Sequence, residues 1–305
     1  MREAMKSNPG LRSKDQQEII ERCEQDVLTF DSARYDCPDE PQIEVRVHVP
    51  PLTRSSVGGS SLRKGIIYFH GGAFILWNAS DFDYQASLKA VTCHSVVFNV
   101  DYRSPPEARA PKGILDCCAA VRFICEELLA QYNVDPKRLC LNGDSSGGYL
   151  AVGTAMELAK KGEVDRIKLV VPDVPAISAH WLRPDDESAD HWSHNEVMRA
   201  SGDGGHIETL KMLCTDWEHQ FSICDPYVFP GEMSDDLLSK FPDCVVLTNE
   251  HCFLRKDAEL FASRLLAHGK LLDFCIRPGI SHYSDIPSVY SDDSSILSRV
   301  VQTYL

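Results

Sequence analysis

Short apolar segments alternate with longer amphipathic segments along most of the chain. Six of the short segments are apolar without strict alternation, which is typical of strands buried on both faces. They cover residues 65–69, 95–100, 138–142, 167–171, 244–248 and 271–276. An earlier segment, 43–49, instead alternates apolar and polar residues, which predicts a half-buried antiparallel strand. Helical patterns cover residues 112–131, 146–161, 256–268 and 287–304.

This order of elements predicts the fold class. Strands that alternate with helices indicate an α/β domain with a mainly parallel, doubly wound sheet flanked by helices. We expect one such domain over residues 1–305. Two segments, 1–40 and about 184–225, do not follow the alternation. We interpret them as a helical cap over the C-terminal edge of the sheet, where α/β proteins form their sites.

Charge and cysteine content narrow the classes of partner. The chain has 31 basic and 45 acidic residues, a formal net charge of −14, which disfavours nucleic acid or an anionic membrane as the main partner. The first 18 residues are polar and lack an apolar targeting core, so we expect a cytoplasmic protein without a membrane span. Twelve cysteines are scattered without paired spacing, which is typical of reduced, buried thiols.

The segment Gly143-Asp144-Ser145-Ser146-Gly147 fits the pattern G-x-S-x-G. It follows an apolar run and opens an Ala-rich helix, the strand–turn–helix setting of a nucleophile elbow. Ser145 is therefore the candidate nucleophile, and the flanking glycines leave room for the sharp turn. The alternative is that the serine only caps the helix.

A second glycine motif, YFHGGAF at 68–74, also follows a predicted strand. Acyl transfer needs backbone N–H donors directed at the developing oxyanion, and adjacent glycines let the backbone approach a substrate closely. Gly71, Gly72 and Ser146 are the expected donors. His70 lies within the motif, so we expect it to fix the loop by a hydrogen bond rather than to act as a base.

One of the eleven histidines has the position of a general base. His282 lies in a Gly/Ser loop after the last predicted strand, where the base falls in the chain order Ser, acid, His. Three other histidines, His191, His194 and His206, lie in the expected cap without the spacing of a metal site. We therefore expect neither a metal nor a cofactor.

Taken together, HGGAF, DYRSPPEARAPKGILDC at 101–117, GDSSGG and a late G-x-x-H resemble the hormone-sensitive-lipase family of serine esterases, which includes arylacetamide-deacetylase-like enzymes. The resemblance runs from about residue 43 to the end. It implies an α/β-hydrolase fold with Ser145 as nucleophile, His282 as base, and Gly71, Gly72 and Ser146 at the oxyanion hole. Trp77 stands where the family often has a glycine, so its indole is expected to narrow the substrate pocket.

The third member of the triad departs from the family pattern. The family acid heads D-P-L-R-D-E, and this alignment places Cys252 at the aspartate position. Among nearby carboxylates, Asp257 falls inside the next predicted helix and Asp285 lies three residues past the base. We therefore predict that Glu250 orients His282, because in an extended chain its side chain would share a face with that of Cys252. The alternative is a site without an acid.

These features predict a carboxylesterase that cleaves small, uncharged esters with acyl chains of roughly two to eight carbons, through an acyl-enzyme. Its expected partner is the small-molecule ester, and a homodimer is the most common assembly for such a chain. The alternative is a ligand-binding protein on a hydrolase scaffold, as in the gibberellin receptors. The missing acid favours that alternative, and the retained His282 disfavours it.

Overall fold

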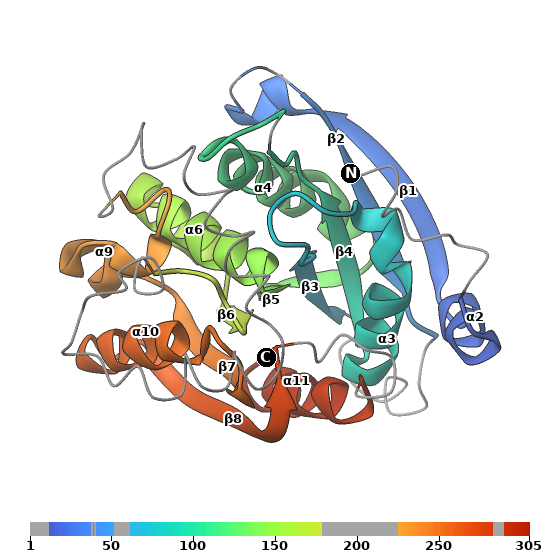
Figure 1. Ribbon diagram of the computed structural model, residues 1–305. Helices are drawn as coiled ribbons and strands as arrows, with labels where there is room; N and C mark the ends of the chain where they lie inside the picture. The colour runs from blue at the N-terminus through green and yellow to red at the C-terminus, as the bar shows by residue number, and fades with distance from the viewer. Residues whose placement is uncertain are drawn as a thin grey trace.

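An eight-stranded sheet in the order β1-β2-β4-β3-β5-β6-β7-β8 runs through the centre of the molecule (Figure 1). The computed structural model describes residues 12–37, 39, 41–51, 62–105, 107–178, 225–282 and 290–305. Its strands are β1 (Glu24–Asp31), β2 (Gln42–Val49), β3 (Arg63–Phe69), β4 (Ser95–Asp101), β5 (Val134–Asp144), β6 (Leu169–Asp173), β7 (Asp243–His251) and β8 (Leu271–Ser281).

From β3 onward, helices alternate with the strands. The helices are α2 (Lys14–Glu21), α3 (Asp83–Cys93), α4 (Lys112–Phe123), α5 (Leu129–Gln131), α6 (Ser146–Lys161), α9 (Asp235–Lys240), α10 (Arg255–Ala267) and α11 (Tyr290–Tyr304). A π-helical turn, Ile124–Leu128, joins α4 to α5. Short 3₁₀ turns cover Ser32–Tyr35, Ala79–Phe82, Val164–Arg166 and Pro230–Glu232.

The strand directions confirm the predicted fold class. Strands β3 to β8 pair in parallel, whereas β2 runs antiparallel to both β1 and β4. All seven strands expected from the apolar pattern are present. The alternation in 43–49 is also explained, because β2 buries Ile43, Val45 and Val47.

The two faces of the sheet are covered by different helices. Apolar residues of α4, α6 and α10 form one core cluster with Ile67, Leu141 and other residues on one face of the sheet. Residues of α3 and α11 form the second cluster with Ile66 and Cys140 on the other face. Neighbouring strand residues therefore point into opposite cores, which is why these strands read as continuous apolar runs.

The N-terminal segment differs from the expected helical cap. Residues 14–21 are helical, but residues 24–31 form β1, an edge strand that pairs with β2. The strand was not predicted because its side chains are mostly exposed, with only Phe30 buried, so the apolar signal is weak. The other expected cap segment, 184–225, lies outside the described residues except for residue 225.

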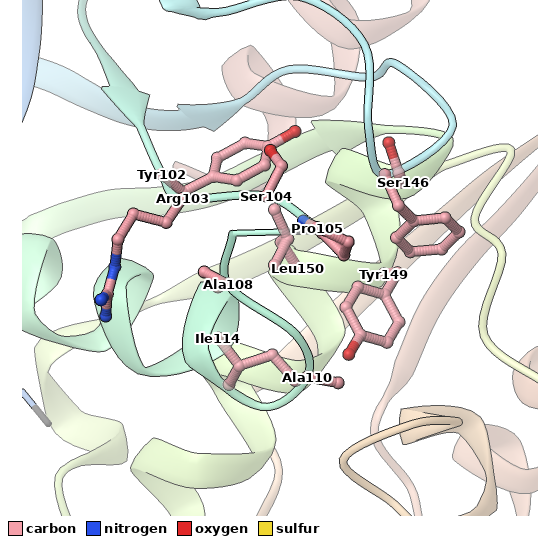
Figure 2. Close-up of a pocket in the computed structure, with 12 residues that line it drawn as sticks. Tyr102, Arg103, Ser104, Pro105, Ala108, Ala110, Ile114, Ser146, Tyr149 and Leu150 are labelled. Carbon is pink, nitrogen blue, oxygen red and sulfur yellow. The ribbon is translucent and has the colours of Figure 1, made fainter. Parts of the chain in front are cut away.

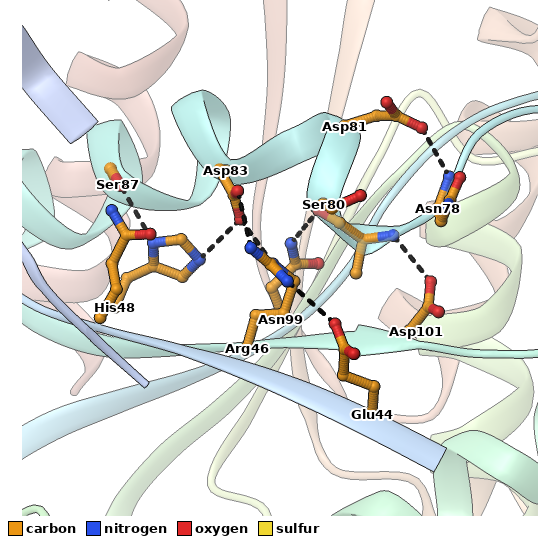
Figure 3. Close-up of polar contacts among 12 residues, drawn as sticks. Glu44, Arg46, His48, Asn78, Ser80, Asp81, Asp83, Ser87, Asn99 and Asp101 are labelled. Carbon is orange, nitrogen blue, oxygen red and sulfur yellow. Dashed lines mark hydrogen bonds and ion pairs between the residues drawn. The ribbon is translucent and has the colours of Figure 1, made fainter. Parts of the chain in front are cut away.

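A polar network holds α3 against β2 (Figure 3). The Arg46 guanidinium bonds both oxygens of Asp83, at 2.7 and 2.9 Å, and also Glu44 at 2.9 Å. Burial lowers the pKa of His48 to about 4. The neutral imidazole contacts Ser87 Oγ through Nδ1 at 2.9 Å. These bonds allow polar residues to occupy a buried face of α3.

No helix in the described part of the chain is long and apolar enough to cross a membrane.

Candidate active site

Ser145 occupies a sharp turn between β5 and α6. Its backbone has φ 57° and ψ −115°, a conformation that is rare for a residue with a side chain. A Cβ atom at Gly143 would lie 2.1 Å from the Gly147 carbonyl oxygen, and one at Gly147 would lie 1.9 Å from the Phe69 oxygen. Neither position can hold a larger residue without moving the backbone. The strand–turn–helix setting expected for a nucleophile elbow is therefore present.

The structure brings the two predicted catalytic side chains together. His282 directly follows β8, and its Nε2 lies 2.9 Å from Ser145 Oγ. The imidazole also packs against the Phe253 ring, with 4.5 Å between ring centroids. A nucleophile and a base at this distance can exchange a proton directly. The contact is the one that a serine nucleophile and a histidine base would make.

The glycine loop after β3 passes beside the serine. A Cβ atom on Gly71 would lie 3.0 Å from the Asp144 oxygen and 3.7 Å from Ser145 Cβ. Gly72 has φ 137°, and a Cβ there would lie 2.3 Å from the Leu76 oxygen. A side chain at Gly72 would be strained and would clash, whereas one at Gly71 would be tight against the Asp144 oxygen. Ser146, the first residue of α6, is adjacent to the nucleophile in the chain.

His70 stabilises this loop, as its place in the motif predicts. Its Nδ1 donates to the Gly71 oxygen at 2.7 Å, and the Tyr102 hydroxyl donates to the His70 oxygen at 2.6 Å. The imidazole stacks between Phe82 and Tyr102, with centroids 4.8 and 4.5 Å away. Burial lowers the pKa of His70 to about 4. The ring is therefore neutral near pH 7 and fixes the loop.

Cys252 takes the position of the triad acid. Its sulfur lies 3.1 Å from Nδ1 of His282, on the ring nitrogen that does not face Ser145. The sulfur also accepts the N–H of Leu254 at 3.3 Å. Burial raises the pKa of the Cys252 thiol far above its ordinary value. A neutral thiol therefore stands where the resemblance implies a carboxylate.

The predicted pairing of Glu250 with His282 is not formed. The Glu250 carboxylate accepts the Gly279 N–H at 2.7 Å, lies 3.9 Å from His251, and is 44% exposed. The prediction assumed an extended chain from 250 to 252. Instead, the pairing of β7 with β8 is irregular between Asn249 and His251, and Cys252 lies beyond the end of β7. The shared side-chain direction is lost at that irregularity.

Of the other two carboxylates, Asp257 does not replace it. Asp257 is buried in α10, where it accepts the backbone N–H and the hydroxyl of Ser178, each at 3.1 Å. Burial raises the pKa of Asp257 to about 7. Asp285 lies outside the described residues. Within the part of the chain that the structure describes, the side chain recorded at Nδ1 of His282 is that of Cys252.

A mainly apolar pocket opens beside Ser146 (Figure 2). Ser146, Tyr149 and Leu150 reach it from α6, and the loop after β4 lies opposite them. Its lining residues are Phe74, Tyr102, Arg103, Ser104, Pro105, Ala108, Ala110, Gly113, Ile114, Ser146, Tyr149 and Leu150. Sequence reasoning missed this lining, although several of these residues fall in the stretch 101–117 that carries the family resemblance.

The charge of Arg103, which lines this pocket, is neutralised by an ion pair with Asp116. Arg103 is the one ionised side chain among the described lining residues, and its Nη2 pairs with the buried Asp116 at 2.7 Å. Trp77, expected to narrow the substrate pocket, is not among the lining residues of this pocket. Its indole is 39% exposed and packs edge-on against Phe82, at 5.8 Å between centroids. The pocket therefore suits an uncharged group.

In the described ranges, no three His, Cys, Asp or Glu side chains are grouped so that they could hold a metal ion. The three histidines considered for a metal, His191, His194 and His206, lie outside those ranges. The described site can transfer a proton between a serine and a histidine. The glycine loop beside it offers backbone N–H groups as possible donors.

Comparisons with known proteins agree with this geometry. Arylacetamide deacetylase-like 2 of Homo sapiens is 37% identical over 139 residues, which are 44% of this chain and 33% of the human protein. Carboxylesterase NlhH of Mycobacterium tuberculosis is 28% identical over 241 residues, 79% of this chain and 70% of that protein. The match to the human protein thus spans only about a third of that relative's length.

Solved structures share the fold. Brefeldin A esterase, described as a bacterial homologue of human hormone-sensitive lipase, superposes with a TM-score of 0.73 at 23% identity, over 97% of this chain and 78% of that chain. The sequence profile of the α/β-hydrolase fold family matches residues 66–284. The chain therefore belongs to the α/β-hydrolase fold family, within the hormone-sensitive-lipase group that its motifs resemble.

Proposed function

We propose that this protein is a carboxylesterase that hydrolyses small, uncharged, short-chain esters through an acyl-Ser145 intermediate. The observation that carries the proposal is the 2.9 Å contact between Ser145 Oγ and His282 Nε2. The printed name of the mycobacterial relative, a carboxylesterase that aligns with 79% of this chain, supports the same reaction class.

The first half of the reaction uses the serine and the base. Ser145 Oγ attacks the ester carbonyl carbon while His282 Nε2 takes the hydroxyl proton. The carbonyl oxygen gains the negative charge, and the backbone N–H groups of Gly71, Gly72 and Ser146 are the donors that would stabilise it. Collapse of this intermediate breaks the bond to the alcohol, which receives the proton from His282.

The second half regenerates the serine. Water enters, His282 accepts one of its protons, and the oxygen attacks the acyl carbonyl. The bond to Ser145 then breaks, the serine recovers its proton from His282, and the acid product leaves. No electron donor or metal is needed for either half, because the bonds made and broken are those of acyl transfer.

The orientation of His282 is the feature of this site that is least suited to catalysis. For Nε2 to accept the serine proton, Nδ1 must carry a hydrogen and donate it to a partner. A neutral thiol is a poor acceptor, and it can instead donate its S–H to Nδ1, which would favour the opposite tautomer. We therefore expect slow turnover compared with a site that has a carboxylate at this position.

The pocket supports the proposed substrate class. Tyr149 and Leu150 present carbon surface next to Ser146, and small residues such as Ala108 and Gly113 complete the wall. Since Arg103 is held by Asp116, an anionic acyl group would find no unpaired cation there. An uncharged acyl or alcohol group fits this wall better than an anionic one.

A panel of p-nitrophenyl esters with increasing acyl length tests the proposal. Wild type should release nitrophenol fastest from the short esters, and Ser145→Ala should release it at the rate of buffer alone. The alternative of a binding protein is disfavoured by the intact contact between Ser145 and His282. A wild-type protein that is stabilised against heat by these esters but releases no nitrophenol would support that alternative instead.

A further inference from the structure

A buried ion pair is linked by hydrogen bonds to the two segments that carry Ser145 and His282. Arg277 of β8 and Asp173 at the end of β6 are only 2% and 4% exposed. Both terminal nitrogens of the guanidinium bond the carboxylate, with Nη1 at 2.8 Å from Oδ2 and Nη2 on Oδ1. Burying such a pair generally adds little net stability, because desolvation offsets the attraction. We therefore expect this ion pair to have a role other than stabilising the fold.

One end of the pair is connected to the nucleophile. The backbone oxygen of Asp173 accepts the N–H of Ser145 at 2.9 Å. The N–H of the next residue, Val174, donates to the Leu247 oxygen in β7, also at 2.9 Å. Asp173 therefore fixes the strained serine turn through its main chain and binds Arg277 through its side chain.

The other end is connected to the base. The Nε of Arg277 donates to the side-chain oxygen of Asn249, a fully buried residue of β7. The amide nitrogen of Asn249 then donates to the Ser281 oxygen at 2.6 Å. Ser281 immediately precedes His282 in the chain. A continuous set of hydrogen bonds thus joins the serine turn to the segment that carries the histidine.

We propose that Asp173, Arg277 and Asn249 are positioning residues that hold His282 in line with Ser145. The proposal rests on the proposed esterase function. In a triad with a carboxylate, that group orients the imidazole directly. Here the Cys252 thiol lies at Nδ1, and the three residues contribute orientation through the backbone of the histidine.

The choice of residue types supports this role. Arg277 uses its planar fork to bond Asp173 and Asn249 together, which a lysine cannot do with a single ammonium group. The contact from Arg277 also fixes which way the Asn249 amide points, since only its nitrogen can donate to the Ser281 oxygen. Each member of the set therefore determines the geometry of the next.

The variant Asn249→Asp is designed to keep the hydrogen bond from Arg277 and to remove the hydrogen bond to the Ser281 oxygen. Its side chain would still accept from Arg277, but in the ionised form it could not donate to the Ser281 oxygen, so both readouts are taken over a pH series. The matched control is Asn99→Asp, because Asn99 is also fully buried in the sheet and donates to a backbone oxygen, that of Ala79, at 2.8 Å. Arg277→Lys is the second test variant.

Two readouts on the full chain test the proposal. The first is the rate at which a fluorophosphonate labels Ser145, and the second is the ¹⁵N NMR signal of His282 Nε2, which reports its bond to Ser145 without turnover. We expect labelling to slow by about 10- to 100-fold in Asn249→Asp and Arg277→Lys, as for other small displacements of a catalytic group. The Nε2 signal should move in both, whereas Asn99→Asp should stay close to wild type in both readouts.

Wild-type labelling rates and an unchanged Nε2 signal in folded Asn249→Asp and Arg277→Lys would overturn the positioning role. Equal losses in Asn99→Asp at equal melting temperature would also overturn it, because the effect would then be general destabilisation. Failure of the esterase function looks different. In that case wild type would resist labelling, while its Nε2 signal would still show the bond to Ser145 and would still move in Asn249→Asp.

Discussion

The sulfur of Cys252 lies 3.1 Å from Nδ1 of His282, at the ring nitrogen that a triad carboxylate would orient. The same sulfur accepts the Leu254 N–H, a donor that a carboxylate oxygen could equally use. The site is therefore built around an acceptor at this point but has a neutral thiol there. This relationship gives the most direct mutational test of the acid position in the proposed triad.

Cys252→Asp should raise kcat. The new carboxylate would accept hydrogen bonds from both the Leu254 N–H and the Nδ1–H of His282, which favours the tautomer that can act as a base. We expect an increase of about 10- to 1,000-fold, since changing a triad aspartate to asparagine in other enzymes costs about 10⁴-fold. Steady-state kinetics with one short ester measure it, with Cys252→Ser as the uncharged control. A folded Cys252→Asp protein no faster than wild type would show that the acid position does not limit the rate.

Glu250→Gln should leave kcat within about twofold of wild type, because the Glu250 carboxylate bonds the Gly279 N–H and not the imidazole of His282. The wild-type carboxylate bonds Gly279 and is partly exposed to solvent, and a glutamine oxygen can accept the same N–H. The same assay on the same ester checks this. If the change instead lowered kcat by about 10³-fold, Glu250 would have to reach His282 in the working enzyme.

Asp257 should make the protein less stable as the pH rises from about 4 to about 7. Burial raises its pKa from 3.8 to about 7 in the folded state, only partly offset by the hydrogen bonds from Ser178. The folded state thus binds the proton more tightly than the unfolded state, and ionisation in this range favours unfolding. The shift corresponds to a free-energy change on the order of 4 kcal/mol.

Urea unfolding of wild type and Asp257→Asn over this pH range measures that contribution. The wild-type free energy of unfolding should decline with pH relative to that of the variant, which has no carboxyl group to ionise. The difference between the two proteins isolates Asp257 from the other titrating groups. Parallel curves for the two proteins would mean that the carboxyl titrates alike in the folded and unfolded states.

Leu150→Ala should shift the ester preference toward longer acyl chains. Leu150 lines the pocket beside Ser146 and is nearly buried, so its truncation removes carbon volume from the wall. Trp77→Gly should not change the preference, because the indole packs on Phe82 and does not line this pocket. Chain-length profiles of kcat/KM compare the two variants. A shift caused by Trp77→Gly alone would place the acyl chain on the indole side of the glycine loop.

Apolar runs such as 65–69 and 138–142 predicted most of the sheet, because parallel strands bury both faces and leave little ambiguity in the sequence. Strand β1 was missed for the opposite reason, since Val27 and most of its other side chains face solvent. Helix α3 was missed because its buried face includes Asp83, which is satisfied by Arg46 from a distant strand. Such a partner is visible only in the folded structure.

The residues of the candidate site also include some that the sequence predicts and some that it does not. Ser145 and His282 were predictable because each lies at a fixed place relative to a strand, and the structure sets them 2.9 Å apart. Glu250 was selected by counting alternate side-chain directions, which the irregular pairing near the end of β7 invalidates. The Arg277 pair gave no local signal, because its partner Asp173 lies 104 residues away in the chain.

The measurement that tests the central claim most directly is covalent labelling of the wild-type protein by a fluorophosphonate, with the modified residue located by mass spectrometry. The reagent phosphorylates a serine only when a neighbouring base activates it, as proposed for Ser145 and His282. We expect one equivalent of label on Ser145, no label on Ser145→Ala, and strongly slowed labelling of His282→Ala. A folded wild-type protein that takes up no label, or takes it up at another residue, would contradict the assignment of Ser145 as the nucleophile.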